Sequence, residues 1–487
     1  MSDSLIKKDL IDIINDLKTN KVSSEQLTKA CLEQIKKFNE QIGAMLWLNE
    51  EKSLEQALAA DKRRANNKSL SDIDGIPIAI KDMILTKDFI SSAASKILEN
   101  FIPPYDATVV EKLKNNGAVI IGKTNQDEFG MGSSTEASAY NICRNPWNSK
   151  HSAGGSSGGS AACISSHMAY GSLGTDTGGS IRQPAAFCGL VGIKPTYGRV
   201  SRYGVTAFAS SLDQVGPMAK NTRSCAKLLS YIAGYDEKDS TCANIAVTDY
   251  AQAIKPDVKN KKIGIPKEYF DKGLPDYMKS AIDNCIKILK DNHADIVDIS
   301  LPHTQYAIAT YYIIATAEAS SNLSRYDGVR FGPRIAQDKS LIDMYSQTRG
   351  QLFGEEVKRR IILGTYVLSA GYYDAYYLQA QKVRRLFAND FKNAFAKVDV
   401  ILSPTTPTSA FMLGSKSKDP LEIYLNDIYT ISANLAGICA ISLPCGKDER
   451  GLPLGVQLMG RPFDEQTLFD TSLLLEESLN FDPNPQM

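Results

Sequence analysis

The sequence carries no excess of either charge. Its 55 lysines and arginines balance 55 aspartates and glutamates, so the formal net charge is zero. A protein that binds nucleic acid by itself needs a basic surface that neutralises phosphates. We therefore expect any RNA in the biology of this protein to be held mainly by a partner.

Patterns for metal sites, disulfides and membrane spans are also missing. The nine cysteines are scattered and never spaced CxxC, and the four histidines do not form HExxH. These patterns argue against a zinc site or a disulfide framework and indicate reduced thiols. No apolar run approaches the roughly 18 residues of a spanning helix. Because the N-terminal segment is amphipathic and charged, unlike a signal peptide, we expect a soluble, cytoplasmic protein.

The composition is that of a globular protein, with 43% hydrophobic residues in 487, ample for a large core. Apolar segments alternate with helical ones, which predicts an α/β fold. The predicted strands are 75–82, 118–124, 261–270, 294–302 and 398–408, with a pair at 438–446 and 452–460. The predicted helices fill 5–60 and most of 305–397, together with 108–115, 222–234, 275–291 and 464–479. Without repeats or a linker, we expect one domain with a helical region (1–65), a core (66–220) and a remainder (221–487).

One stretch rich in glycine and serine organises the chain, GGSSGGSAACISSHMAYGSLGTDTGGSIRQP from Gly154 to Pro184. Its two glycine-serine clusters flank a segment, 160–172, that is predicted to be a buried helix or a tightly packed loop. Glycine lets backbone approach closely and adopt positive φ. The clusters therefore predict a site where bared N–H groups surround a serine hydroxyl. A flexible linker fits poorly, because the intervening segment is apolar enough to pack.

Two short motifs point to other functions. The segment GAVIIGKT, ending in Gly122-Lys123-Thr124, matches the P-loop pattern, but its Ala-Val-Ile-Ile belongs in a strand rather than in a phosphate loop. The segment 154–158 matches the GxSxG elbow, which requires an apolar strand before it and a histidine base after it. The preceding residues are polar and turn-forming, and the base would have to be His293 or His303. We disfavour both interpretations.

Three separated segments remain, GIPIAIKD around Lys81, GGSSGGSAA around Ser156 and GTDTGGSIRQPA around Ser180. In order and spacing they resemble the amidase signature family. Longer matches extend the resemblance over nearly the whole chain, towards the branch formed by the A subunits of tRNA-dependent amidotransferases. These are ATAEASSNLSRYDGVRFG, EEVKRRIILGTYVLSAGYYDAYY, SPTTPTSAF and NDIYTISANLAG. The resemblance implies one large domain whose central mixed sheet is covered by helices on both faces.

The resemblance also implies a Ser-Ser-Lys triad. Ser180 would be the nucleophile and Lys81 the base, with Ser156 between them in a cis peptide. Amide hydrolysis needs an activated nucleophile and a proton shuttle, and Lys81 can be a base only if burial lowers its pKa enough to make it neutral. The alternative role for Lys81 is a structural ion pair with the adjacent Asp82.

The loop around the nucleophile would supply the oxyanion hole. Its backbone N–H groups are those of Thr177, Gly178, Gly179 and Ser180, and such donors stabilise the charge that develops on the attacked carbonyl oxygen. Three nearby charged residues are expected to brace this loop as structural support, namely Arg182, Asp176 and Asp213.

A free amino acid substrate needs a cation, an anion and a hydrogen bonder in its pocket. By resemblance these are Arg360 for the α-carboxylate, Asp427 for the α-ammonium group and Tyr311 as the hydroxyl partner. The adjacent Arg359 and Tyr312 leave each assignment open by one position.

The resemblance implies a glutaminase that feeds ammonia to a partner for amidating Glu-tRNA(Gln), Asp-tRNA(Asn) or both. The partners would be the B and C subunits of a heterotrimer, with the tRNA held mainly by the B subunit. No cofactor or metal is expected in this chain, since ATP and Mg²⁺ would be used by the partner. Two alternatives stay open: a free-standing amidase with an apolar substrate channel, and a nucleotide-binding module built on Lys123.

Overall fold

The computed structural model describes residues 2–270, 273–336, 339–415 and 425–487. The strands are β1 (Met45–Trp47), β2 (Pro77–Lys81), β3 (Val119–Thr124), β4 (Arg144–Asn145), β5 (Asn148–Ser152), β6 (Gly171–Asp176), β7 (Val191–Lys194), β8 (Gln214–Ala219), β9 (Lys262–Pro266), β10 (Asp295–Ile299), β11 (Val400–Pro404), β12 (Cys439–Lys447) and β13 (Pro453–Gly460). The helices are α1 (Ser2–Ile6), α2 (Leu10–Lys18), α3 (Ser24–Ile42), α4 (Glu50–Ala65), α5 (Thr108–Asn115), α6 (Gly158–Ser165), α7 (Arg182–Phe187), α8 (Thr222–Ile232), α9 (Tyr250–Ala253), α10 (Asp276–Asp291), α11 (Ala307–Asn322), α12 (Leu341–Leu352), α13 (Glu355–Val367), α14 (Gln379–Phe395), α16 (Ile431–Ala436) and α17 (Glu465–Leu479).

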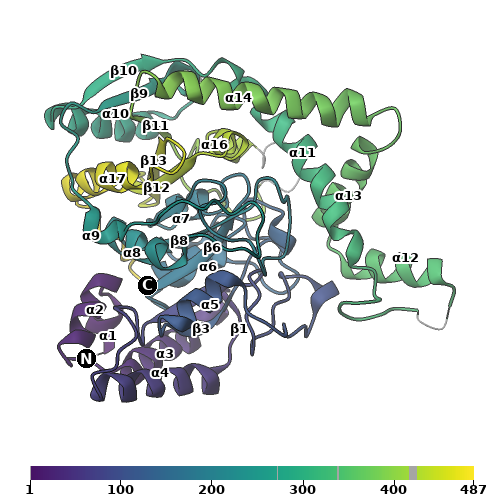
Figure 1. Cartoon of the computed structure of the whole chain (residues 1–487), viewed down its shortest axis with the longest axis horizontal. Coiled ribbons are helices and arrows are strands. Elements are labelled where there is room, and N and C mark those ends of the chain that lie inside the picture. Colours follow the sequence, from purple (N-terminus) through teal and green to yellow (C-terminus); the bar gives the residue numbers. More distant parts are fainter. Residues whose placement is uncertain (1, 271–272, 337–338, 416–424) are drawn as a thin grey trace.

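A large mixed sheet forms the centre of the molecule. Within the described residues it has 11 strands in the order β1-β3-β2-β6-β8-β7-β12-β13-β11-β9-β10. β2 runs parallel to both β3 and β6, whereas β6, β8, β7, β12, β13 and β11 follow one another antiparallel. Helices cover both faces of the sheet (Figure 1). The predicted α/β class and mixed sheet are confirmed.

Helices and strands whose apolar residues are regularly spaced begin and end close to the predicted residues. α5 and the antiparallel pair β12–β13 agree with prediction, and α3 begins with the capping box of Ser23 and Gln26. The predicted strand 261–270 ends earlier, because the chain turns into a 3₁₀ helix at Lys267–Tyr269. The region 5–60 contains β1 besides its helices.

Two strands next to the site were missed from the sequence. β6 reads GSLGTD and β8 reads QVGPMA, and each has a single β-branched residue, Thr175 and Val215, and no aromatic one, so the residues typical of a strand are scarce in both. Both are fully buried between neighbouring strands. Their ladder hydrogen bonds and the close approach of covering helices, rather than side-chain propensity, therefore decide that they are strands.

The P-loop pattern lies in a strand, as predicted. GAVIIGKT contributes the whole of β3, and Lys123 is buried with its Nζ donating to the Ile84 carbonyl at 2.5 Å and to the Ser91 hydroxyl at 2.7 Å. The residues before the GxSxG pattern were predicted to be turn-forming; the chain does turn at 146–147, but the prediction is wrong for Asn148–Ser152, which forms β5. β5 pairs only with β4 among the described strands, in a small sheet apart from the central one.

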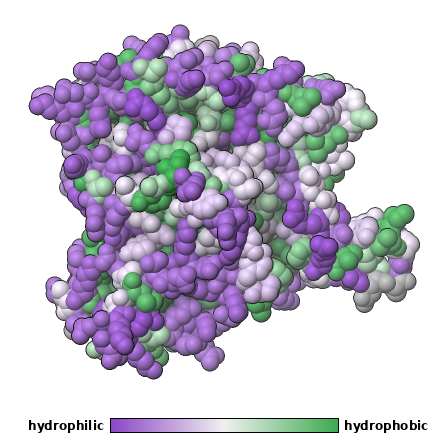
Figure 2. Space-filling model, viewed as in Figure 1, coloured by the Kyte–Doolittle hydropathy of each residue, from purple (hydrophilic) through white to green (hydrophobic). Residues whose placement is uncertain are grey.

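Within the predicted helical stretch 305–397, α11, α12 and α13 form an arm at one side of the sheet, whereas α14 runs back over it (Figure 1). α11, α13 and α12 follow one another away from it, with α12 at the far tip (Figure 1). Apolar side chains lie exposed on this arm (Figure 2), among them Ile342 at 77% and Ile362 at 68%. Among the described helices, none combines the length and apolar character needed to cross a bilayer. All nine cysteines are buried free thiols.

Candidate active site

Lys81 lies at the end of β2 with its side chain fully buried. Its Nζ is 2.8 Å from each of three hydroxyl oxygens, Ser156 Oγ, Ser157 Oγ and Thr175 Oγ1. β6 runs alongside β2 and supplies Thr175, while the two serines precede α6. The parallel pairing of two buried strands thus places a lysine among hydroxyl groups.

Burial lowers the pKa of Lys81 from 10.5 to about 7, although the charges of Asp127, Asp176 and Asp213 oppose the shift. Among the described residues no carboxylate lies within 4 Å of its Nζ. The adjacent Asp82 instead accepts from Ser92 Oγ at 2.6 Å and from a backbone N–H. The alternative of a structural ion pair between Lys81 and Asp82 is therefore wrong.

The backbone at Ser156 is cis at the Gly155–Ser156 peptide, as the resemblance predicted. Asp127 lies directly beside it and donates its N–H to the Ser156 carbonyl at 3.2 Å. A Cβ added at Gly155 would lie 2.2 Å from Asp127 Oδ2 and 2.4 Å from the nitrogen of Ser134. Only glycine allows the two segments to approach so closely.

Ser180 lies in the loop between β6 and α7, and its carbonyl accepts the N–H of Ser157 at 3.2 Å. This bond ties the loop to the Ser156 segment. The Gly179 N–H donates to Asp176 Oδ1 at 2.8 Å. Because this N–H is already bonded, the prediction that Gly179 is an oxyanion donor is wrong for this structure. Thr177, Gly178 and Ser180 remain as candidates.

Charged residues brace this loop, as predicted. Arg182 and Asp176 are fully buried and form two bonds of 3.0 Å, and Arg182 also donates to the Thr430 carbonyl at 3.0 Å. Despite the opposing effect of burial, the Arg182 guanidinium holds the pKa of Asp176 at about 2. Asp213 accepts the Thr177 hydroxyl at 2.7 Å. The nucleophile loop is thus held from both ends.

The predicted substrate residues come from three distant segments. Asp427 is buried, accepts the Ser133 hydroxyl at 2.5 Å, and has a pKa that burial raises to about 7, against the pull of the Arg360 charge. Tyr311 packs against the nucleophile loop, since a Cβ on Gly178 would lie 2.7 Å from its ring. Burial raises the pKa of the Tyr311 hydroxyl, and the positive charge of Arg360 opposes this rise.

Burial separates the adjacent candidates. Arg360 is 2% exposed, whereas the side chain of Arg359 is 46% exposed. Tyr311 is buried and Tyr312 is half-buried. The Arg360 guanidinium lies 5.3 Å from the ring centre of Tyr312, and its Nε donates to Glu356 at 2.8 Å. The structure thus turns Arg360 and Tyr311 inward, while their roles remain predictions.

Sequence reasoning missed three hydroxyl residues at the site. Ser157 and Thr175 contact Lys81, and Ser133 contacts Asp427. Ser157 follows Ser156 directly and Thr175 lies five residues before Ser180, so both motifs contained a signal. Ser133 had none, because 294 positions separate it from its partner.

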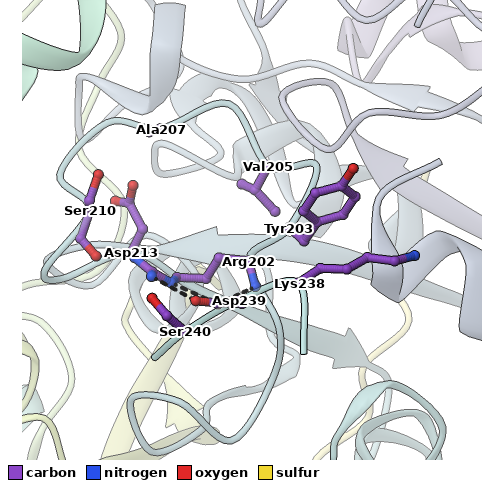
Figure 3. Close-up of a pocket in the computed structure, with 9 residues that line it drawn as sticks. All are labelled: Arg202, Tyr203, Val205, Ala207, Ser210, Asp213, Lys238, Asp239 and Ser240. Atoms are coloured by element: carbon purple, nitrogen blue, oxygen red, sulfur yellow. Dashed lines mark hydrogen bonds and ion pairs between the residues drawn. The ribbon is translucent and has the colours of Figure 1, made fainter. Parts of the chain in front are cut away.

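A separate pocket of about 250 Å³ is lined, mostly by polar side chains, by residues of the 202–213 segment and of the 238–240 segment (Figure 3). Asp213 reaches its wall, but none of the triad residues lines it. Arg202 and Asp239 face each other there in an ion pair of 3.0 Å, while Lys238 extends away from them. Because Arg202 and Asp239 neutralise each other and no triad residue lines this pocket, we do not assign the amide chemistry to it.

Comparisons with known proteins identify the family of this chain and several similar proteins. The chain matches the family described as Amidase over residues 26–469. The A subunit of the glutamyl-tRNA(Gln) amidotransferase of Geobacter metallireducens is 54% identical over 462 residues, with 95% of each chain covered. The protein of the same name from Geobacter sp. strain M21 is 55% identical over 460 residues, covering 94% of this chain and 95% of its own length. The crystal structure of the same protein from Thermotoga maritima has a TM-score of 0.81 at 40% identity, covering 99% of this chain and 97% of that one. The peptide amidase of Stenotrophomonas maltophilia has a TM-score of 0.83 at 28% identity, with 99% of both chains covered.

Proposed function

Because this chain belongs to the amidase family, we propose that it hydrolyses glutamine as the A subunit of a tRNA-dependent amidotransferase. The observation that carries the proposal is the fully buried Lys81, whose Nζ lies 2.8 Å from Ser156 Oγ and which faces hydroxyls instead of carboxylates. Such a lysine can accept a proton near neutral pH. The names of the relatives supply the substrate class.

In the proposed reaction the Ser180 oxygen attacks the side-chain amide carbon of glutamine. Its proton passes to Ser156, whose own proton passes to neutral Lys81. The N–H groups of Thr177, Gly178 and Ser180 stabilise the oxyanion. When the carbon–nitrogen bond breaks, Lys81 returns the proton through Ser156 to the leaving nitrogen, which departs as ammonia. Water then attacks the glutamyl ester of Ser180 by the same route and releases glutamate.

The pocket residues select a free amino acid. Arg360 pairs with the α-carboxylate, Asp427 with the α-ammonium group and Tyr311 offers its hydroxyl. Ser133 supports Asp427 through its 2.5 Å hydrogen bond. Charged hydrogen bonds of this kind are the strong ones in proteins. A free-standing amidase for apolar amides fits less well, because its substrate channel would be lined by apolar side chains and not by a buried arginine and a buried aspartate such as Arg360 and Asp427.

The ammonia is consumed outside this chain. The B and C subunits would complete a heterotrimer in the cytoplasm, where the B subunit holds the mischarged tRNA and uses ATP and Mg²⁺ to activate its acyl group. Relatives are named for Glu-tRNA(Gln), so we propose this tRNA as the acceptor. The zero net charge of this chain supports its dependence on a partner for tRNA.

Covalent trapping tests the assignment of the nucleophile. A glutamine-like electrophile should label Ser180, as identified by peptide mass spectrometry, and the label should be absent from Ser180→Ala. The Ser156→Ala variant is the matched control, because it should slow labelling without moving the label to another residue. Label on Ser156 in the unmodified chain would contradict the mechanism and favour the nucleophile elbow.

A further inference from the structure

A buried carboxylate beside the site takes no part in the proposed chemistry. Glu128 is 1% exposed and directly follows Asp127, whose N–H donates to the Ser156 carbonyl. One oxygen of Glu128 accepts from the Ser95 hydroxyl, and the other accepts the N–H of Gly354 at 2.8 Å. Burial raises the pKa of this carboxyl to about 7. Its partners thus lie on two segments far apart in the chain.

Gly354 is the N-cap residue of α13, so Glu128 holds the start of that helix. The first N–H groups of a helix lack partners within it, and a negative charge is favourable there. The φ of Gly354 is −69°, which any residue can adopt. However, a Cβ at this position would lie 2.4 Å from Glu128 Oε2. Glycine therefore serves the close approach of the carboxylate and not the backbone conformation.

The same helix carries Arg360. Six residues separate it from Gly354, which is about 9 Å along a helix axis. Further along, a Cβ added at Gly364 would lie 1.9 Å from the Thr316 carbonyl oxygen of α11, so the second half of α13 rests closely on that helix. The N-terminal half is joined to the catalytic segment through Glu128.

We propose that Glu128 is a positioning residue for glutamine binding. Glu128 fixes the N-terminus of α13, and the neighbouring Asp127 bonds to the Ser156 carbonyl. Through these two bonds Glu128 sets the position of the Arg360 guanidinium relative to the triad. This inference rests on the proposed function, because it assumes that Arg360 binds the α-carboxylate. A purely structural Glu128 would affect every substrate alike, whereas a positioning residue affects the substrates that Arg360 holds.

Two variants break the bond from opposite sides. Glu128→Ala removes the acceptor. Gly354→Pro removes the donor, and because a Cβ there would lie 2.4 Å from Glu128 Oε2, its ring also pushes the carboxylate away. The backbone angles themselves suit proline, since Gly354 has φ −69° and ψ 164° and the preceding Phe353 is extended at φ −86° and ψ 137°. Glu128→Gln is the matched control, because its amide oxygen can accept from Gly354 and its NH₂ can donate to Ser95.

The measurement compares glutamine with 4-aminobutanamide, which is glutamine without its α-carboxylate. The chain is assayed together with its partners in the complex. We expect Glu128→Ala and Gly354→Pro each to raise KM for glutamine about 10-fold with a smaller change in kcat, as for a weakened charged hydrogen bond. Hydrolysis of 4-aminobutanamide should keep the rate of the unmodified chain, and Glu128→Gln should behave normally on both substrates.

The double variant Glu128→Ala/Gly354→Pro should be no worse than either single variant, because both remove one interaction. Equal losses on the two substrates, or additive losses in the double variant, would overturn the positioning role. If Glu128→Ala does not fold, Gly354→Pro gives the same readout by itself. An unmodified complex that hydrolyses no glutamine would reject the proposed function and this inference with it, whereas an active complex with equal losses rejects only the inference.

Discussion

At Lys81, three hydroxyl groups surround the amine in place of a carboxylate, and this difference decides its chemistry. A carboxylate contact would favour the ammonium form, whereas hydroxyls in a buried site leave desolvation as the main influence. The pKa accordingly falls to about 7. Asp427 follows the same physics with opposite charge, since burial raises its pKa to about 7. Burial thus brings the pKa values of a lysine and an aspartate, which ordinarily lie far apart, to the same region near 7.

Removing the base tests the triad. We expect Lys81→Ala to lower glutaminase turnover by about 100-fold or more, which is typical of a lost general base. Lys81→Arg should be as inactive, because arginine stays protonated. Steady-state rates should be measured beside circular dichroism, to show that each variant is folded. A folded Lys81→Ala variant with near-normal rates would end the triad mechanism.

The acid side of the pH profile should report both groups. Lys81 must be neutral and Asp427 must be ionised, and both conditions are met above their pKa values of about 7. We therefore expect kcat/KM for glutamine to rise with pH through 7. Below pH 7 its pH dependence should be that of two ionisations, because Lys81 and Asp427 must each lose a proton. Glutaramate, which lacks the α-ammonium group, should show the loss of one proton. Identical profiles for the two substrates would show that Asp427 does not bind the ammonium group.

Substitution of Asp427 tests the same contact directly. We expect Asp427→Asn to lower kcat/KM for glutamine by about 10- to 100-fold, the value of a charged hydrogen bond, and to affect glutaramate much less. Asp448→Asn is a matched control, because Asp448 is 8% exposed and also accepts a serine hydroxyl, from Ser409 at 2.7 Å. Equal losses on both substrates would assign Asp427 to the fold.

Among the elements, the nucleophile loop depends on a close contact with the segment that precedes α16. Gly179 has φ +132°, and a Cβ there would lie 2.2 Å from Thr430 Oγ1. Thr430 in turn donates its hydroxyl to the Gly178 carbonyl at 2.7 Å. The loop therefore has no room for a side chain at this position and little freedom to move away.

We expect Gly179→Ala to lower stability by roughly 1–3 kcal/mol through strain and overpacking, and to reduce glutaminase activity because the loop carries Ser180. Gly350→Ala is the control, since Gly350 lies within α12 and a Cβ there meets nothing within 4 Å. That change should stabilise the chain by about 0.5–1 kcal/mol at unchanged activity. Urea unfolding and glutaminase assays measure both effects. Normal activity in Gly179→Ala would show that the loop tolerates displacement.

For the whole molecule, the absence of a net charge bears on how the chain meets tRNA. Its 55 basic and 55 acidic residues provide no overall attraction for phosphates. We expect glutaminase activity to rise when the partners and acylated tRNA are added to the chain. Filter binding over a salt series should show that the chain alone binds tRNA weakly. Tight, salt-sensitive binding by the chain alone would contradict this dependence.

Local sequence was informative wherever one segment carries its own signal. The helix Thr108–Asn115 follows its apolar spacing, and the apolar residues of GAVIIGKT predicted a strand in spite of the P-loop pattern. β6 could not be predicted in this way, because GSLGTD is a strand only through its pairing with β2 and β8. Lys81 could be named from its motif, but the choice between ion pair and base depended on Thr175 and the two serines around it.

Local sequence was enough to predict the α/β class, the helices and strands with a clear hydrophobic period, and the motifs that carry the family resemblance. These features depend on residues near one another along the chain, where period and propensity act. The tertiary structure decided which of Arg359 and Arg360 turns inward, which N–H of the nucleophile loop is occupied, and how Glu128 meets Gly354. Each of these depends on groups brought together by sheet pairing and helix packing, and a pKa or a hydrogen bond responds to distance in space rather than to position in the chain.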